Sequence, residues 1–314
     1  MEKIRVGFIV GPTGTGKSAL AVEIAGRLGA EIVNADSRLL YRGMDIGTAK
    51  LPVAERCGVP HHLIDVRSPE KPLDVAGFRE LARRAIAGIA WRGRAIIVTG
   101  GSGFYLKVMQ HGIFDGPPAS RPIRIEFAAL AAERGTAYLH DRLREIDPEA
   151  ASRISPGDLC RITRALEVFR LTGTPISVHQ RRHAFAAAEY DAITVGLDLP
   201  RERLYAAIED RFDAMVAAGL VDEVRGLLRA GLATDAPVLR TIGYRQIAAY
   251  VRGELSLADA IATAKRDTRR LAKRQMTWFR SDPAIVWIDP DRGREQAFAL
   301  FRDFLPAGRK WLRA

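Results

Sequence analysis

Short apolar segments alternate along the chain with longer segments whose apolar residues recur at helical spacing. The apolar and β-branched residues predict buried strands over residues 5–10, 31–36, 94–99, 190–198 and 284–289. Helical segments separate most of these strands, and this order predicts a parallel sheet with helices on both faces. The pattern therefore predicts an α/β fold.

The helix expected after the first strand has clear limits. Leu20, Ile24 and Leu28 recur every four residues, and Gly29 stands where a helix commonly ends in a left-handed residue. This helix begins directly after a glycine-rich turn, so a strand, a turn and a helix follow one another.

The pattern changes between the third and fourth predicted strands. The segment Gly116-Pro-Pro-Ala-Ser-Arg-Pro122 is rich in residues that break helices and strands, and the periodicity after it is mainly helical. We therefore predict an all-helical insertion at residues 117–189. The core into which it is inserted then consists of residues 1–116 and 190–314.

The composition is that of a globular protein, with 47% apolar and 27% charged residues in a chain of 314. The chain has 48 Lys and Arg and 37 Asp and Glu, which gives a formal net charge of +11. Such a charge indicates a polyanionic partner, and the charge alone leaves RNA, DNA and a phosphorylated metabolite open.

Several classes of protein are excluded or disfavoured. The two cysteines, Cys57 and Cys160, belong to no C-x-x-C pair, which excludes a disulfide scaffold and a zinc ribbon. No apolar run reaches the roughly 18 residues of a membrane helix, and the N-terminal apolar segment runs directly into Gly11-Pro12. We expect a cytoplasmic protein that does not bind membranes.

A complete phosphate-binding motif follows the first predicted strand. The motif G-x-x-x-x-G-K-[ST] is present between a strand and a helix, which is the context it requires. Its glycines allow backbone N–H groups to surround phosphate oxygens, Lys17 adds a charge, and the Ser18 hydroxyl can reach Mg²⁺. The predicted diphosphate-binding residues of this loop are Gly11, Pro12, Thr13, Gly14, Thr15, Gly16, Lys17 and Ser18.

The carboxylate that usually accompanies such a loop is displaced. A kinase or ATPase needs an acid at the end of a neighbouring strand to hold Mg²⁺, but strand 94–99 is followed by Gly100-Gly-Ser-Gly103. Asp36 ends the second predicted strand instead. If the bound diphosphate is a leaving group, the loop stabilises its charge and Asp36 accepts a proton from the nucleophile. The alternative is that Asp36 is a helix N-cap or turn residue.

These motifs together closely resemble the tRNA dimethylallyltransferase family, also called tRNA isopentenyltransferases. The resemblance extends from residue 6 to about residue 289. It rests on the phosphate loop and on Asp36-Ser37, Tyr41-Arg-Gly-Met-Asp-Ile-Gly-Thr-Ala-Lys50, His61-His-Leu-Ile-Asp65, Gly100-Gly-Ser-Gly-Phe-Tyr105, Gly243-Tyr-Arg-Gln246 and Lys273-Arg-Gln-Met-Thr-Trp-Phe-Arg280. The chain is similar to the bacterial form, because it lacks the cysteines of the C-terminal zinc finger that eukaryotic relatives carry.

The resemblance implies a fold and a reaction. The fold is a P-loop NTPase-like, nucleotide-kinase-like core with a helical insertion that grips the anticodon stem-loop. The reaction transfers a dimethylallyl group from dimethylallyl diphosphate to N6 of the tRNA adenosine 3′-adjacent to the anticodon, at position 37, and releases diphosphate. The resemblance also implies Mg²⁺ as a cofactor, and we expect the protein to act as a monomer.

The resemblance further assigns roles to single residues. It implies that Asp36 is the general base at N6 and that Lys17 and Ser18 hold the diphosphate, with Mg²⁺ at Ser18. Arg211 matches a family arginine that also grips the diphosphate. Ser102 stands where the family usually has Thr, so a catalytic hydroxyl is retained.

The residues that match tRNA-contacting positions of the family lie in several segments. Cys160 departs from the family pattern, in which an amide-bearing Gln is common. The expected tRNA-binding residues are Asp36, Ser37, Arg38, Leu39, Ser102, Arg124, Cys160, Arg161, Ile162, Thr163, Arg164, Arg240, Thr241, Ile242, Gly243, Tyr244, Arg245, Lys273, Arg274, Gln275, Met276, Thr277, Trp278, Phe279 and Arg280.

The charge pattern near the C-terminus independently favours RNA. From Lys265 to Arg280 there are seven Lys or Arg and one acid, Asp267. A solvated helix usually mixes both signs, so this segment indicates contact with a polyanion. On one helical face, a stripe that includes Ile261, Leu271 and Trp278 is expected to pack on the core.

The proposed chemistry also needs an apolar enclosure. An allylic carbon that loses diphosphate becomes cationic, and water in the site would hydrolyse it. Phe104-Tyr-Leu106 and Leu39-Leu-Tyr41 are candidates for this wall, with ordinary core packing as the alternative.

Three other functions remain as alternatives. A P-loop nucleotide kinase or ATPase, which would bind ATP, is disfavoured by the missing strand-end acid. A prenyltransferase that acts on free adenine nucleotides would not need two basic segments. One of these is residues 265–280, and the other lies in the insertion and contains Arg161, Arg164, Arg170, Arg181 and Arg182. A non-catalytic RNA-binding module would leave Lys17, Ser18 and Asp36 without a role.

Overall fold

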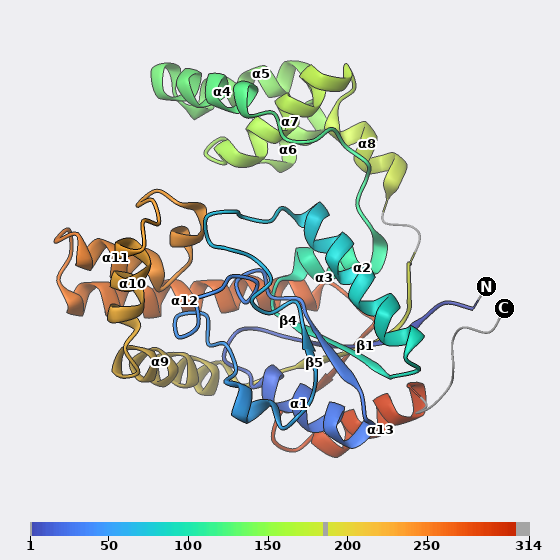
Figure 1. The fold of residues 1–314 in the computed structure, drawn as a ribbon. Helices are drawn as coiled ribbons and strands as arrows, with labels where there is room; N and C mark the ends of the chain where they lie inside the picture. The colour runs from blue at the N-terminus through green and yellow to red at the C-terminus, as the bar shows by residue number, and fades with distance from the viewer. Residues whose placement is uncertain (1, 185–187, 306–314) are drawn as a thin grey trace. The chain divides into compact units, whose positions relative to one another are not determined.

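The computed structural model describes residues 2–184 and 188–305, and Figure 1 shows the order of the elements along the chain. The chain divides into two compact units. One consists of Met1–Gln110 and Ala188–Ala314, and we call it the core unit. The other, His111–Ala187, we call the helical unit.

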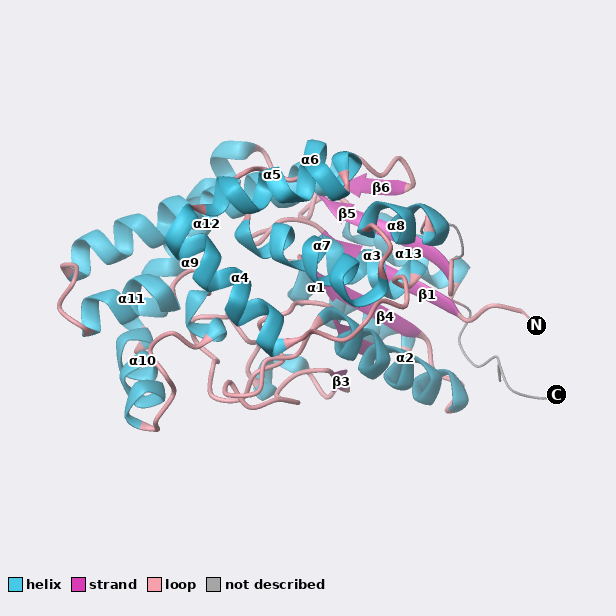
Figure 2. Cartoon of the chain, turned by 90° about the horizontal axis from the view of Figure 1, so that it is seen from above, coloured by secondary structure: helices cyan, strands magenta, loops and turns pink. Residues whose placement is uncertain are grey.

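The core unit contains a parallel sheet, as the sequence predicted. In the described residues the sheet has six strands, all paired in parallel, in the order β3-β2-β4-β1-β5-β6 (Figure 2). The strands are β1 Arg5–Val10, β2 Glu31–Asn34, β3 His61–His62, β4 Ile96–Gly100, β5 Asp191–Leu197 and β6 Ile285–Ile288. Strand β3 was not predicted, because an edge strand of two residues produces no periodic pattern.

Helices cover both faces of the sheet because both faces are apolar. Successive strand residues point to opposite sides, so Phe8 and Val98 belong to one buried cluster while Ile9 and Ile97 belong to another. Helices α2 and α3 contribute to the first cluster, and α1 and α13 contribute to the second. Their bounds are α1 Lys17–Leu28, α2 Val75–Trp91, α3 Gly103–His111 and α13 Arg294–Phe304.

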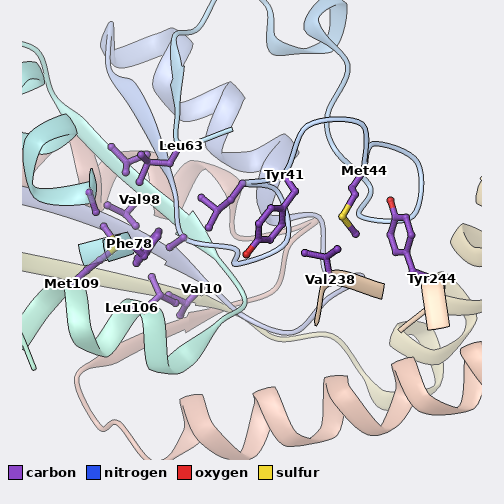
Figure 3. Close-up of a cluster of buried hydrophobic side chains, with 14 of the residues drawn as sticks. Val10, Tyr41, Met44, Leu63, Phe78, Val98, Leu106, Met109, Val238 and Tyr244 are labelled. Carbon is purple, nitrogen blue, oxygen red and sulfur yellow. The ribbon is translucent and has the colours of Figure 1, made fainter. Parts of the chain in front are cut away.

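The first cluster continues beyond the sheet. Figure 3 shows it extending from Val10 and Val98 to Met44, Val238 and Tyr244. The last two residues come from a group of helices between β5 and β6. These elements are α9 Arg201–Ala217, α10 Leu220–Arg229, the 3₁₀ helix Pro237–Arg240, α11 Tyr244–Val251 and α12 Leu257–Arg280; a second 3₁₀ helix, Val53–Arg56, precedes β3.

The helical unit has a core of its own, which includes Leu139, Leu143, Ile162 and Leu166. Its helices are α4 Arg121–Arg134, α5 Thr136–Ile146, α6 Pro148–Arg153, α7 Leu159–Thr172 and α8 Ile176–His183, and its described residues form no strand. The sequence placed the insertion at 117–189. The unit begins earlier because Phe114 stacks on His179 and so belongs to it.

None of the helices in the described part of the chain combines the length and the apolar character needed to cross a membrane.

Candidate active site

The glycine-rich turn between β1 and α1 has a backbone conformation that suits glycine alone. Gly11, Gly14 and Gly16 have φ angles of 142°, 91° and 82°, a region that residues with a Cβ rarely adopt. The buried Thr15 hydroxyl donates a hydrogen bond to the Pro12 carbonyl oxygen at 2.9 Å. The turn is thus preformed between the strand and the helix that the sequence predicted.

Lys17 lies at the start of α1 and points back over the turn. Its Nζ donates to the Pro12 carbonyl oxygen at 2.6 Å. Burial of the ammonium group lowers the pKa of Lys17 to about 8; Asp36 opposes this shift and Arg211 adds to it. A phosphate group bound in the turn would provide a negative counter-charge and so stabilise the charged form of Lys17.

Two cavities adjoin the turn, at the carboxyl ends of the parallel strands where α/β proteins commonly bind ligands. The smaller, of about 80 Å³, is lined by Lys17, Ser18 and Thr99, and we call it the phosphate cavity. The larger, of about 510 Å³, we call the base cavity. Six residues line both cavities: Thr13, Asp36, Thr48, Gly101, Arg211 and Gln275.

Asp36 therefore lies where the two cavities meet. One oxygen of its carboxylate accepts the Arg38 N–H at 2.9 Å, and its own N–H donates to Asn34 Oδ1 at 2.9 Å. The turn role that the sequence left open is thus real, and among the described residues the second carboxylate oxygen accepts no hydrogen bond. The hydrogen bonds of this turn therefore fix the position of the Asp36 carboxylate.

Arg211 of α9 also lies at this junction, because it lines both cavities. Its guanidinium group donates to Thr13 Oγ1 at 2.6 Å. Burial lowers the pKa of Arg211 below its usual value, and Asp36 partly offsets this effect. The structure thus brings Lys17, Asp36 and Arg211 to one place, although Arg211 is far from the other two in sequence.

Gln275 of α12 connects the phosphate loop to the loop after β4. Its Oε1 accepts the Thr13 N–H at 2.9 Å, and its Nε2 donates to the Gly101 carbonyl oxygen at 2.8 Å. A Cβ at Gly101 would lie 2.6 Å from Gln275 Nε2, and one at Gly103 would lie 2.3 Å from the Trp278 ring. Glycine at both positions therefore allows α12 to approach. The sequence assigned Gln275 to tRNA and did not predict this role.

Thr99 occupies the strand end where a kinase would carry its acid. Its hydroxyl is buried, lines the phosphate cavity and has no hydrogen-bond partner in the described part of the chain. The described residues also contain no group of three or more His, Cys, Asp or Glu that could hold a metal ion. This hydroxyl was not predicted, because the motif specifies an acid at that position and assigns no role to a threonine.

The candidate apolar wall is only partly in the cavities. Phe104 and Tyr105 line the base cavity and Leu39 lines the phosphate cavity. Leu40, Tyr41 and Leu106 are buried in the core cluster instead. Ser102 lines the base cavity, and its Oγ accepts the Ser37 N–H at 3.3 Å, so its hydroxyl is next to the loop that carries Asp36.

Most of the predicted RNA-binding residues of helix α12 line two different cavities. Arg274, Gln275 and Trp278 line the base cavity. Lys273, Met276, Thr277 and Arg280 line a second groove of about 480 Å³ beside Tyr205. The expectation that Leu271 and Trp278 pack on the core was wrong, because the base cavity lies against that part of the helix and Trp278 is 45% exposed.

Acidic residues outside the helix balance part of its charge. Lys265 binds Asp213 at 2.7 Å, Arg269 binds Glu209, and Arg280 binds Asp198 at 3.1 Å. Within the described residues, Lys273 and Arg274 make no ion pair. These two cations are therefore the ones on α12 best placed to meet an external polyanion.

Several residues that were expected to contact tRNA have buried side chains. Ile162 and Thr163 lie inside the helical unit, and Tyr244 and Phe279 lie inside the core unit. Their burial directs these four side chains into the interior, so contact with tRNA through their backbone groups stays a prediction. Of their neighbours, Cys160, Arg161, Arg240 and Arg245 are exposed, and Thr241 and Ile242 line the base cavity.

A buried carboxylate organises the arginines of the helical unit. Glu167, which is 0% exposed, accepts hydrogen bonds from Arg124 at 2.9 and 3.0 Å, from Arg164 at 2.7 Å and from the Ser120 N–H at 2.7 Å. Burial alone would raise the pKa of Glu167, but these donors together hold it below its usual value. Arg124 and Arg164 are therefore held at fixed positions.

Comparison with known proteins shows extensive similarity. The IPP transferase family model matches residues 39–282. The tRNA dimethylallyltransferase of Geobacter metallireducens is 49% identical over 288 residues, which cover 92% of this chain and 93% of that protein. The tRNA dimethylallyltransferase of Moorella thermoacetica is 48% identical over 305 residues, with 95% and 94% covered.

Solved structures agree with the sequence comparison. The tRNA isopentenylpyrophosphate transferase of Bacillus halodurans is 38% identical, with a TM-score of 0.71 and 96% of each chain covered. A eukaryotic dimethylallyltransferase, described as acting on tRNA, is 25% identical with a TM-score of 0.81 over 98% of this chain and 81% of its own.

Replacing Glu167 by glutamine tests the arrangement in the helical unit. We expect the free energy of unfolding to fall by about 2 kcal/mol, because charged hydrogen bonds to a buried group are removed while the half-exposed arginines can turn to water. Since the donors depress the pKa of Glu167, its stabilising effect is present at neutral pH and is lost as the pH falls. Urea unfolding would measure both effects. Glu126→Gln, which removes an exposed pair with Arg170, is the control; equal losses in the two variants would contradict the assignment.

Proposed function

This chain belongs to the IPP transferase family, and from that premise we propose that it transfers a dimethylallyl group from dimethylallyl diphosphate to N6 of adenosine 37 in tRNA. The observation that carries the proposal is the junction of the two cavities. Asp36 and Arg211 line both of them, so one carboxylate and one guanidinium face a phosphate site on one side and a larger cavity on the other.

The diphosphate of the donor binds in the phosphate cavity. Lys17 and Arg211 supply positive charge there, and the N-terminus of α1 adds the potential of its free N–H groups. As the bond between the allylic carbon and the diphosphate oxygen breaks, the electron pair leaves with the diphosphate. These groups stabilise that charge more strongly in the transition state than before it.

The adenine binds in the base cavity. A base stacked in an anticodon loop must turn out of the loop to enter a cavity of this kind. N6 then attacks the allylic carbon, and Asp36 takes the proton that N6 loses. Trp278, Phe104 and Tyr105 line this cavity, so the developing allylic cation is surrounded by aromatic groups rather than water.

The phosphate cavity fits Mg²⁺ bound mainly through substrate. The Ser18 and Thr99 hydroxyls line it, and the Thr99 hydroxyl has no partner among the described residues. Mg²⁺ keeps several waters and commonly uses few protein ligands together with substrate phosphates. When bound, it would neutralise part of the charge on the departing diphosphate, and Ser18 would help to hold it.

We propose that the helical unit grips the anticodon stem-loop through exposed cations such as Arg161, which is 75% exposed in its side chain. On the core unit, Arg274 and Lys273 would add phosphate contacts. We propose that the protein acts as a monomer. We propose the cytoplasm as the location, since the substrate is tRNA.

Asp36→Asn tests the general base. The amide oxygen of asparagine still accepts the Arg38 N–H, so the turn should remain, while the proton acceptor is removed. We expect single-turnover transfer to slow by about 10² to 10⁴, with tRNA affinity nearly unchanged. Asp235→Asn, at an exposed position, is the control. Transfer at the parent's rate would remove Asp36 from this role.

The pKa of Lys17 predicts how donor binding depends on pH. Below its pKa of about 8 the ammonium group is charged, and above it the free protein loses that charge. The affinity for dimethylallyl diphosphate should therefore fall, by roughly tenfold, as the pH rises well past 8. Lys17→Met should bind weakly at every pH and show no such dependence. If the substitution abolishes ATP turnover instead of prenyl transfer, the kinase alternative is correct.

Lys273→Ala and Arg274→Ala test the RNA-facing part of α12. Each should weaken tRNA binding and lower the slope of log K against log salt by about one for each phosphate group that the variant no longer binds. Only Arg274 lines the base cavity, so only its replacement should also slow transfer at saturating tRNA. Arg225→Ala on α10 is the control, and salt slopes equal to the parent's would mean that this helix faces another partner.

A further inference from the structure

Glu223 of α10 receives an unusual number of hydrogen bonds for a residue outside the described site. Its Oε2 accepts the N–H groups of Asp45 at 2.8 Å and Ile46 at 2.7 Å. Its Oε1 accepts the Gly47 N–H at 3.1 Å and the Tyr244 hydroxyl at 2.5 Å. One carboxylate thus satisfies three consecutive backbone donors and a phenol.

The loop needs this carboxylate to hold its shape. Residues 44–48, which we call the wall loop, belong to no helix or strand, so their backbone groups need partners other than those of a sheet or helix. Consecutive N–H groups that point the same way form a site for an anion, and Glu223 supplies one from within the chain. Bonds of this kind to a charged acceptor are about twice as strong as neutral ones.

Tyr244 makes the connection more rigid. Burial and the Glu223 carboxylate both raise the pKa of Tyr244, so its hydroxyl remains protonated and continues to donate. A Cβ at Gly47 would lie 2.5 Å from the Tyr244 ring and 2.8 Å from Leu220. The wall loop therefore packs directly on α10 and α11, and Figure 3 shows Tyr244 beside Met44.

The other end of the loop is fixed separately. Lys50, whose side chain is 4% exposed, donates to the Tyr41 carbonyl oxygen at 2.9 Å and pairs with Asp65 at 2.6 Å and with Asp45. The segment between the two anchors contains Thr48. Its conformation is therefore determined by Glu223 on one side and Lys50 on the other.

The two segments that Glu223 connects both line the site. Gly47 and Thr48 form part of the base cavity, and Thr48 also lines the phosphate cavity. Arg240, Thr241 and Ile242 line the base cavity as well, and one residue, Gly243, separates them from the start of α11 at Tyr244. The carboxylate thus links two walls of one cavity without lining either cavity itself.

We propose that Glu223 is a positioning residue for the transfer reaction, which sets the distance between the wall loop and the segment 240–242. This inference rests on the proposed function, because the wall loop borders both the donor diphosphate and the adenine there. Small displacements of groups that orient two reactants reduce rates strongly. Glu223 therefore acts through the wall loop and touches neither substrate.

Glu223→Gln, Tyr244→Phe and a control, Asp222→Asn, test the proposal. Asp222 is the exposed neighbour of Glu223 on α10 and pairs only with Arg225 in the described residues. Hydrogen exchange should be at least about tenfold faster at the amides of residues 45–47 in Glu223→Gln, and less affected in Tyr244→Phe. At saturating tRNA, kcat for prenyl transfer should fall about tenfold or more and KM for dimethylallyl diphosphate should rise. tRNA affinity without donor should stay within about threefold of the parent.

The outcomes separate this proposal from the function on which it rests. Faster exchange with unchanged kcat and KM, at a temperature where the variant is folded, would make Glu223 a structural anchor only and overturn the proposal. If Glu223→Gln does not fold, Tyr244→Phe decides, with a fall in transfer of about threefold as the supporting result and no change as the contrary one. Absence of prenyl transfer by the parent protein itself would refute the proposed function.

Discussion

The site depends on one side chain that holds α12 against the carboxyl edge of the sheet. Gln275 accepts the Thr13 N–H of the phosphate loop and donates to the Gly101 carbonyl oxygen after β4. The approach requires glycine at 101 and 103, where a Cβ would collide with Gln275 and Trp278. Because α12 is fixed there, its residues Arg274 and Trp278 border the base cavity while Gln275 borders both cavities. The two cavities therefore meet at a place that the phosphate loop, β2, β4, α9 and α12 all reach.

The charges at this junction suit a leaving diphosphate better than a nucleotide that keeps its phosphates. Lys17 and Arg211 are partly deprived of water, which lowers the pKa of each, and an anion between them would relieve that cost. The strand-end position that holds an acid in P-loop kinases carries Thr99 instead. Asp36 is then the carboxylate whose charge acts on both cations, and its position between the cavities suits proton transfer.

Two carboxylates that line neither cavity, the buried Glu167 and the half-buried Glu223, hold other parts of the molecule in place. Glu167 fixes two arginines of the helical unit, and Glu223 fixes the wall loop against α10 and α11. Each carboxylate accepts hydrogen bonds from at least three donors, so neither leaves an unpaired charge. Both hold other residues in place, and neither lines the base cavity or the phosphate cavity. Tyr244 and Ile162, which match family positions, also have a structural role, because both side chains are buried.

The sequence by itself determined the parallel α/β core, the phosphate loop between β1 and α1, the helical character of the insertion and the family, because these depend on local periodicity and on contiguous motifs. It also identified Asp36, Lys17 and Arg211 as partners, the last through resemblance alone. Tertiary structure decided which residues of a motif face a cavity and which face a core. The segment 273–280 illustrates this, because the helical period directs its residues alternately to the base cavity, to a second groove and to the interior. It also decided the roles of Gln275, Glu167 and Glu223, most of whose partners are distant in sequence, and no local pattern records which groups a distant carboxylate or amide will reach.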